Sequence, residues 1–120
     1  MSDIERVATD PRRSRAVIYN GMVFIAGQTC DDRTQDIKGQ TLQALAKIEK
    51  FLAAAGTDKS RLISAQIWMA DIRRDVASMN EVWDGWTAPG AAPTRATAQV
   101  TFASRDLLVE IMVTAAVSVQ

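Results

Sequence analysis

The pair Asn20-Gly21 constrains the fold more than any other feature of the chain, because it separates two short apolar runs. Both residues tolerate a positive φ, which suits the two-residue type I′ turn of a β-hairpin. Side chains alternate along a strand, so this hairpin has apolar residues on both of its faces. One face carries Val17, Tyr19, Met22 and Phe24, and the other carries Ala16, Ile18, Val23 and Ile25.

Two segments show apolar residues at the three- and four-residue spacing of amphipathic helices. The first predicted helix is capped by Asp36 or Thr34 and runs to Ala55, with Gly56 as its stop. Its buried stripe is predicted to consist of Ile37, Thr41, Ala44, Leu45, Ile48, Phe51, Leu52 and Ala55. The second helix is predicted over residues 75–86, with Val76, Met79, Val82, Trp83 and Trp86 on its apolar side.

Strand-like patterns at 62–69, 93–100 and 109–115 complete the chain. The order β-β-α-β-α-β-β predicts one α+β domain over residues 1–120, with both helices on one face of a mixed sheet. Residues 1–15 are predicted to form a solvated N-terminal arm that carries a small basic cluster. Two helices can cover only one face of the sheet, so the second apolar face of the hairpin needs another partner. Self-association is the simplest answer.

The composition excludes several classes of function. The chain has no histidine, so Ser-His-Asp and Cys-His arrangements and the common zinc sites are absent, and we expect no metal or cofactor. Cys30 has no partner for a disulfide, and we interpret it as a reduced bystander thiol rather than a nucleophile. The formal net charge of zero gives no electrostatic footprint for nucleic acid.

Apolar runs in the chain are all too short for a membrane span. Residues 1–6 also lack the apolar core of a secretory signal. We therefore expect a cytoplasmic protein that does not bind membranes.

Arg95 and Glu110 are the candidate chemical groups, because each lies on a predicted strand beside apolar neighbours. Alternation places Arg95 and Thr97 on one face of the segment 93–100, pointing away from the core. If this strand pairs with 109–115, Arg95 and Glu110 share a polar face. There the guanidinium could bind a carboxylate, and Glu110 could accept a proton from water. A surface ion pair between the two residues is the simpler interpretation of the spacing alone.

Four blocks of sequence, at 20–28, 40–56, 70–83 and 93–111, carry a further signal. In order and spacing they resemble the RidA (YjgF) family of small imine and enamine deaminases, over roughly residues 16–117. The first block is similar to the family's G-x-x-x-x-x-S-G-Q strand, and the second to its helix with a closing A-A-G. Ala70-Asp71-Ile72 with Met79-Asn80-Glu81-Val82-Trp83 is similar to the D-x…x-N-x-x-Y/W block. Pro93-Thr94-Arg95 with Val109-Glu110-Ile111 is similar to the P-x-R…(I/V)-E-(I/V) ending.

The resemblance implies a chorismate-mutase-like fold and a homotrimer with a barrel-like centre and ligand clefts between subunits. It also implies that Arg95 anchors the carboxylate of a small 2-imino or 2-enamino acid, while Glu110 orients or activates the attacking water. The remaining implied substrate-binding positions are Ala26, Gly27, Asn80, Trp83 and Thr97. From the residues alone, local hydrogen bonds are the favoured interpretation of Asn80, and packing is the favoured interpretation of Trp83 and Trp86.

Three positions depart from the family pattern and indicate a paralogous subgroup. Ala26 stands where the best-known members carry serine, Thr97 where many carry cysteine, and Arg13 or Ser14 where a tyrosine is usual. The leading alternative function is a non-catalytic trimer that binds a small carboxylate through Arg95. A ribonuclease or translation inhibitor, a label attached to some relatives, is a weaker alternative because the chain lacks histidine and a basic aromatic groove.

Overall fold

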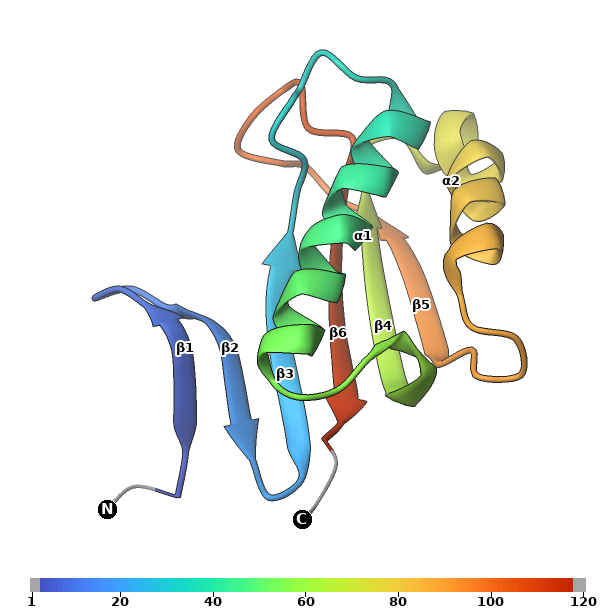
Figure 1. Ribbon diagram of the computed structural model, residues 1–120. Coiled ribbons are helices and arrows are strands. Elements are labelled where there is room, and N and C mark those ends of the chain that lie inside the picture. Colours follow the sequence, from blue (N-terminus) through green and yellow to red (C-terminus); the bar gives the residue numbers. More distant parts are fainter. Residues whose placement is uncertain (1–2, 118–120) are drawn as a thin grey trace.

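The computed structural model describes residues 3–117 as two α-helices lying on one face of a six-stranded mixed sheet (Figure 1). The elements are β1 (Glu5–Thr9), β2 (Ser14–Tyr19), β3 (Met22–Gln28), α1 (Ile37–Ala54), the short 3-10 helix η1 (Lys59–Arg61), β4 (Leu62–Met69), α2 (Ile72–Trp86), β5 (Thr94–Gln99) and β6 (Val109–Ala116). The strand order is β1-β2-β3-β6-β4-β5, and among the described strands β4 and β5 are the one parallel pair. The α+β prediction is confirmed, with one strand more than expected.

The hairpin predicted from Asn20-Gly21 is formed by β2 and β3. Both turn residues have positive φ, 53° for Asn20 and 79° for Gly21, as a type I′ turn requires. The register pairs Tyr19 with Met22, so the turn is as short as the sequence predicts.

The additional strand lies in the segment predicted to be a solvated arm. β1 pairs antiparallel with β2, so the arm prediction is wrong for this part of the chain. The reason is Asp10, whose carboxylate closes the turn between the two strands. It accepts hydrogen bonds from the backbone N–H groups of Arg12 (2.7 Å) and Arg13 (3.0 Å) and pairs with the Arg15 guanidinium at 3.0 Å. Led by the hydrogen bond from Arg12 N, these contacts lower the pKa of Asp10 to about 2. Residues 1–2 of the predicted arm lie outside the described residues.

Both helices begin at an aspartate. The Asp36 carboxylate accepts a hydrogen bond from Gly39 N at 2.9 Å and caps α1, which ends before Gly56 as predicted. The Asp71 carboxylate accepts one from Arg74 N, so α2 starts a little earlier than its apolar periodicity indicates. The buried residues of α1 follow the predicted stripe, except that Gln40 is buried and Phe51 is only half-buried.

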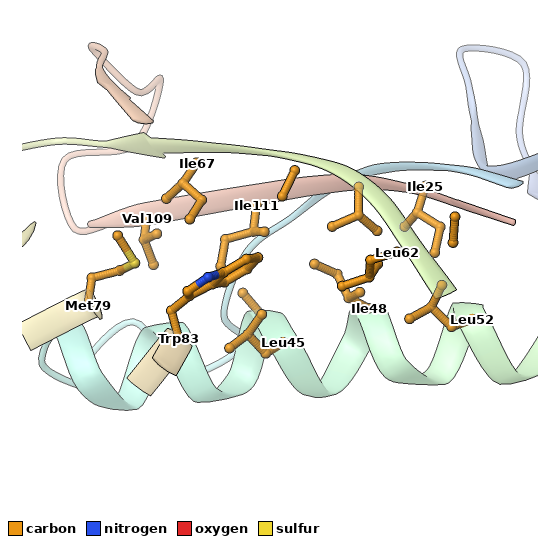
Figure 2. Close-up of a cluster of buried hydrophobic side chains, with 14 of the residues drawn as sticks. Ile25, Leu45, Ile48, Leu52, Leu62, Ile67, Met79, Trp83, Val109 and Ile111 are labelled. Carbon is orange, nitrogen blue, oxygen red and sulfur yellow. The ribbon is translucent and has the colours of Figure 1, made fainter. Parts of the chain in front are cut away.

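The core fills the space between the helices and the sheet (Figure 2). Burial of one large apolar side chain stabilises the fold by roughly 1.5–3 kcal/mol, so this layer is the main source of stability. Its largest members include Leu45, Ile48, Leu52, Ile67, Met69, Met79, Val109 and Ile111.

The opposite face of the sheet is not covered by any described residue. Phe24 is paired with Thr114 in the middle of the sheet and is 44% exposed, and Trp68 on β4 is 36% exposed. Tyr19, at the hairpin end, is 45% exposed. We call this side the open face and the helix side the covered face. As predicted, the hairpin places apolar residues on both.

Candidate functional site

Arg95 lies on the covered face of the sheet, at its edge. The register of β5 with β4 pairs Arg95 with Ala65 and Thr97 with Ile67, and both of these β4 residues are buried beneath the helices. Because β5 is an edge strand, the Arg95 side chain remains exposed while it reaches across to α2. The prediction that Arg95 points away from the core is therefore wrong. Its strand, β5, pairs with β4 and not with β6, and the pairing with β4 places Arg95 on the covered face.

Asn80 and Trp83 of α2 hold the Arg95 guanidinium. Arg95 Nη1 donates a hydrogen bond to Asn80 Oδ1 at 2.8 Å, and the guanidinium carbon lies 5.7 Å from the centre of the Trp83 ring. The two α2 residues are adjacent on the helix surface, because positions i and i+3 face the same way. A cation over an aromatic face is attracted by about 0.5–1 kcal/mol at an exposed site. Asn80 thus makes a tertiary contact rather than a local one, and Trp83 combines packing with a contact to Arg95.

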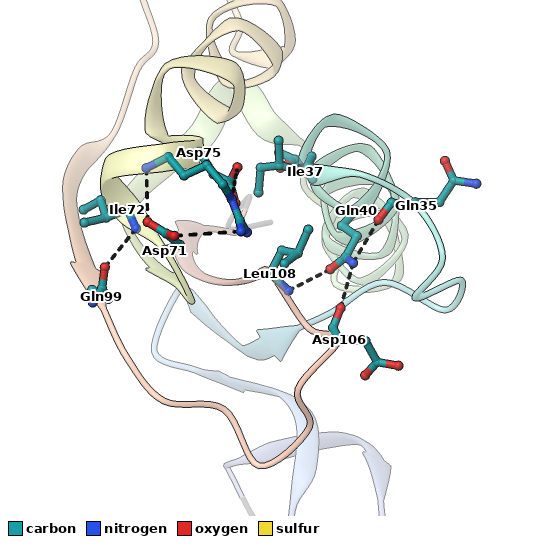
Figure 3. Close-up of polar contacts among 11 residues, drawn as sticks. Gln35, Ile37, Gln40, Asp71, Ile72, Asp75, Gln99, Asp106 and Leu108 are labelled. Atoms are coloured by element: carbon teal, nitrogen blue, oxygen red, sulfur yellow. Dashed lines mark hydrogen bonds and ion pairs between the residues drawn. The ribbon is translucent and has the colours of Figure 1, made fainter.

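A second contact holds α2 against β5. Gln99 Oε1 accepts a hydrogen bond from Ile72 N, the first residue of α2, at 3.0 Å (Figure 3). Trp86, also on α2, makes its hydrogen bond elsewhere: its Nε1 donates to Glu49 on α1 at 2.6 Å.

Thr97 lies on the same face of β5 as Arg95. Its hydroxyl oxygen is buried and has no hydrogen-bond partner among residues 3–117. Most buried hydroxyl groups are paired, and an unpaired one costs about 1–3 kcal/mol. We call Arg95, Asn80, Trp83 and Thr97 the anchor group.

Glu110 lies on the open face, half-buried and directly opposite Trp68 of β4. Its carboxyl group lies against the backbone of Gly27. A Cβ atom at position 27 would lie 2.8 Å from Glu110 Cδ, inside the 3.0 Å that real Cβ atoms keep. The β3–β6 register shifts between Ile25 and Gln28, so the Gly27 backbone lies in a bulge. A side chain at position 27 would therefore force the Glu110 carboxyl group to shift.

Ala26 precedes Gly27 in the same bulge. It lines a shallow depression of about 240 Å³ in the open face, between β3, β4 and β6. We call Glu110, Gly27 and Ala26 the acid group.

The anchor group and the acid group lie on opposite faces of the sheet. β4 separates their strands, and along β4 the partner of Arg95 (Ala65) is buried while the partner of Glu110 (Trp68) is exposed. None of the ion pairs among residues 3–117 involves Arg95. The predicted shared face, and with it the surface pair between Arg95 and Glu110, is absent from the described part of the chain. A single chain therefore carries Arg95 and Glu110 on opposite faces of the sheet.

Neither a reactive cysteine nor a metal site is found among residues 3–117. Cys30 is buried, and burial raises the pKa of its thiol, which disfavours the reactive thiolate. Over residues 3–117, no three Cys, Asp or Glu side chains gather closely enough to hold a metal ion. The helices found in this same range include none with the length and apolar character to cross a membrane.

Comparison with known proteins identifies the family. The family model described as Endoribonuclease L-PSP matches residues 4–117. The chain belongs to this YjgF/RidA/RutC family. A RutC family protein from Haemophilus ducreyi is 41% identical over 117 residues, which are 98% of this chain and 99% of that protein. RutC family protein YoaB from Escherichia coli is 36% identical over 114 residues, 95% of this chain and 98% of that protein.

Solved structures of similar proteins share the fold. A YjgF family protein from Neisseria meningitidis has a TM-score of 0.94 at 37% identity and covers 98% of both chains. A Pseudomonas aeruginosa protein has a TM-score of 0.92 at 37% identity and covers 96% of this chain and 99% of its own. The RidA-like fold that the sequence blocks indicated is thereby confirmed, and the family includes imine deaminases.

Proposed function

We propose that this protein hydrolyses small reactive 2-imino or 2-enamino acids to 2-keto acids and ammonia, as a cytoplasmic homotrimer that needs no metal. Membership in a family that includes imine deaminases supports the reaction class. The observation that carries the proposal is the division of Arg95 and Glu110 between two half-sites on opposite faces of the sheet.

Arg95 binds the carboxylate of the substrate. Its guanidinium is oriented by Asn80 and Trp83, and no carboxylate among residues 3–117 forms an ion pair with it. A planar guanidinium in a fixed orientation presents two parallel N–H donors, which match the two oxygens of a carboxylate. The unpaired Thr97 hydroxyl lies on the same face and supplies a further polar group beneath the anchor.

Glu110 orients the attacking water and accepts its proton. The water oxygen adds to the electrophilic imine carbon, and the proton then passes to the nitrogen. The resulting carbinolamine then transfers its hydroxyl proton to the nitrogen, and the C–N bond breaks as the C=O bond forms, which releases ammonia and the 2-keto acid. A 2-enamino acid first becomes the imine by gaining a proton at C3 and losing one from nitrogen. A positioned acid/base group contributes about 10²–10⁴-fold to such a step. Gly27 keeps the space beside the Glu110 carboxylate free of a side chain.

A second copy of the chain completes the site. One chain cannot bring Arg95 and Glu110 to the same small substrate, because the sheet lies between them. The open face, with Phe24 44% exposed and Trp68 36% exposed, has the apolar character that self-association buries. In a closed ring the same contact repeats around the axis, so the anchor group at the edge of one sheet meets the acid group on the open face of the next.

The test measures 2-keto acid formation from imines generated in situ by an amino-acid oxidase. Wild-type protein is expected to accelerate their hydrolysis above the spontaneous rate. Glu110→Gln keeps the shape of the side chain but removes the proton acceptor, so turnover is expected to fall about 10²-fold or more while pyruvate binding is kept. Equal imine decay with and without wild-type protein would refute the deaminase proposal. Pyruvate binding under those conditions would favour the non-catalytic carboxylate-binding alternative.

A further inference from the structure

Gln40, in the first turn of α1, is a polar residue that is fully buried, with 0% of its surface exposed. Its amide makes three hydrogen bonds, all to backbone atoms (Figure 3). Nε2 donates to the carbonyl oxygens of Asp106 at 2.9 Å and Gln35 at 3.2 Å, and Oε1 accepts from Leu108 N at 2.9 Å. The amide therefore links the start of α1 to a distant part of the chain.

That distant part leads directly into β6, where Glu110 lies. Both backbone polar groups of Leu108 are hydrogen-bonded: its N–H donates to Gln40 Oε1, and its carbonyl oxygen accepts from Ala70 N at 3.1 Å. The side-chain polar contacts of the preceding residues Ser104 and Asp106 are exposed, such as the ion pair of Arg33 and Asp106 at 3.6 Å. Exposed ion pairs contribute little to stability, whereas a buried polar group that loses its partner is destabilising. Gln40 thus supplies buried side-chain hydrogen bonds that hold the backbone just before β6, in addition to the pairing of β6 with β4.

The facing strand is held in a similar way. Gln28, 6% exposed, donates from Nε2 to Ala26 O at 2.9 Å and supports the bulge that contains Gly27. Buried amides therefore hold both strands that form the contact between Glu110 and Gly27: Gln28 holds β3, and Gln40 holds the start of β6. A carboxylate that must lie against a bare backbone requires both strands to be fixed.

We propose that Gln40 is a positioning residue for Glu110, which fixes the start of β6 so that the carboxylate stays against Gly27. This inference rests on the proposed deaminase function. Gln40 makes none of its hydrogen bonds to the anchor group, which lies on β5 and α2. Loss of Gln40 is therefore expected to reduce kcat and to leave carboxylate binding in place. A misplacement of about 1 Å can cost up to about 10²-fold in rate.

The test compares Gln40→Met with Thr41→Val in the full chain. Thr41 is the next residue of α1 and is also 0% exposed, but its hydroxyl donates only to Ile37 O within the helix, at 2.7 Å. Each change removes buried hydrogen bonding from the same turn, and only Gln40→Met releases the segment before β6. We expect Gln40→Met to lower kcat about tenfold or more, with the Kd for pyruvate within about twofold of wild type. Thr41→Val is expected to leave both quantities nearly unchanged. If Gln40→Met does not fold, Gln40→Asn retains the amide but shortens its reach, and the same division between kcat and Kd is expected.

The outcomes separate this inference from the proposed function. Inactive wild-type protein would overturn both. Active wild-type protein with equal kcat values in the Gln40 and Thr41 variants would overturn the inference alone, since the loss would then reflect general destabilisation. A parallel weakening of pyruvate binding in the Gln40 variant would also overturn it.

Discussion

The two faces of the sheet differ in how their apolar residues are covered: α1 and α2 bury the covered face, whereas no described residue buries the open face. The covered face packs Ile67 and Ile111 under α1 and α2, and its core is complete within one chain. The open face exposes Phe24 and Trp68 and carries Glu110, whose proposed partner Arg95 lies on the other side. The core of the covered face is thus built from one chain, whereas the proposed chemistry needs a second copy.

The largest effect is expected from placing a charge on the open face. Phe24→Glu should abolish the proposed trimer and the proposed deaminase activity, because assembly would bury a carboxylate without a partner. Folding should survive, since Phe24 is outside the core and 44% exposed. Leu42→Glu is the matched control, because Leu42 is 57% exposed on α1. Light scattering should give about three times the chain mass of 13.1 kDa for wild type and the control, and the chain mass for Phe24→Glu. A trimeric Phe24→Glu protein would show that the open face is not the interface.

The next largest effect is expected at the anchor group. Arg95→Lys keeps the charge but replaces a planar pair of donors with a point charge on a flexible stem. The change should nearly abolish turnover and weaken pyruvate binding by about tenfold or more, from the loss of about 1.5–3 kcal/mol of charge-assisted hydrogen bonding. Calorimetric titration of both proteins with 2-keto acids measures the loss. Equal affinities would mean that Arg95 does not hold the carboxylate.

A smaller effect is expected at Gly27. Gly27→Ala places a Cβ atom against the Glu110 carboxyl group, so the carboxylate must shift and kcat should fall by about tenfold. Gly85→Ala in α2 is the control, because a Cβ there meets no atom within 4 Å. The control should keep full activity and gain about 0.4–1 kcal/mol of stability through the lower entropy of its unfolded chain. Steady-state kinetics measures kcat for both variants, and thermal unfolding measures their stability. An unaffected kcat in Gly27→Ala would show that the contact between Gly27 and the Glu110 carboxyl group has no role in turnover.

Local sequence signals were sufficient for most elements of the fold. The Asn20-Gly21 turn, the Asp36 cap and the apolar stripe of α1 each act between residues close in the chain, and the structure agrees with each. β1 was missed because Val7 is its only half-buried residue and the turn after it depends on the contacts of Asp10.

The face of Arg95 could not be predicted from the pattern of β5. This strand contains mostly small or polar residues, and none of them is fully buried, so alternation alone does not indicate which side faces the helices. That side is set by the parallel pairing of β5 with β4. This is a tertiary contact, because the whole of α2 lies between the two strands in the sequence. Gln40 was missed for a related reason, because the backbone groups that allow an amide to be buried lie in the segment before β6.

The central claim is that each site takes Arg95 from one copy and Glu110 from another. It is tested by unfolding inactive Arg95→Lys and Glu110→Gln proteins together and refolding the equimolar mixture. About half of the chains supply an intact Arg95 and half an intact Glu110, so about one interface in four should hold both, and about a quarter of wild-type activity should return. Trimers mixed without unfolding should stay inactive. No recovery in the co-refolded mixture, under conditions where refolded wild type regains its activity, would contradict the shared site and place both residues within one chain.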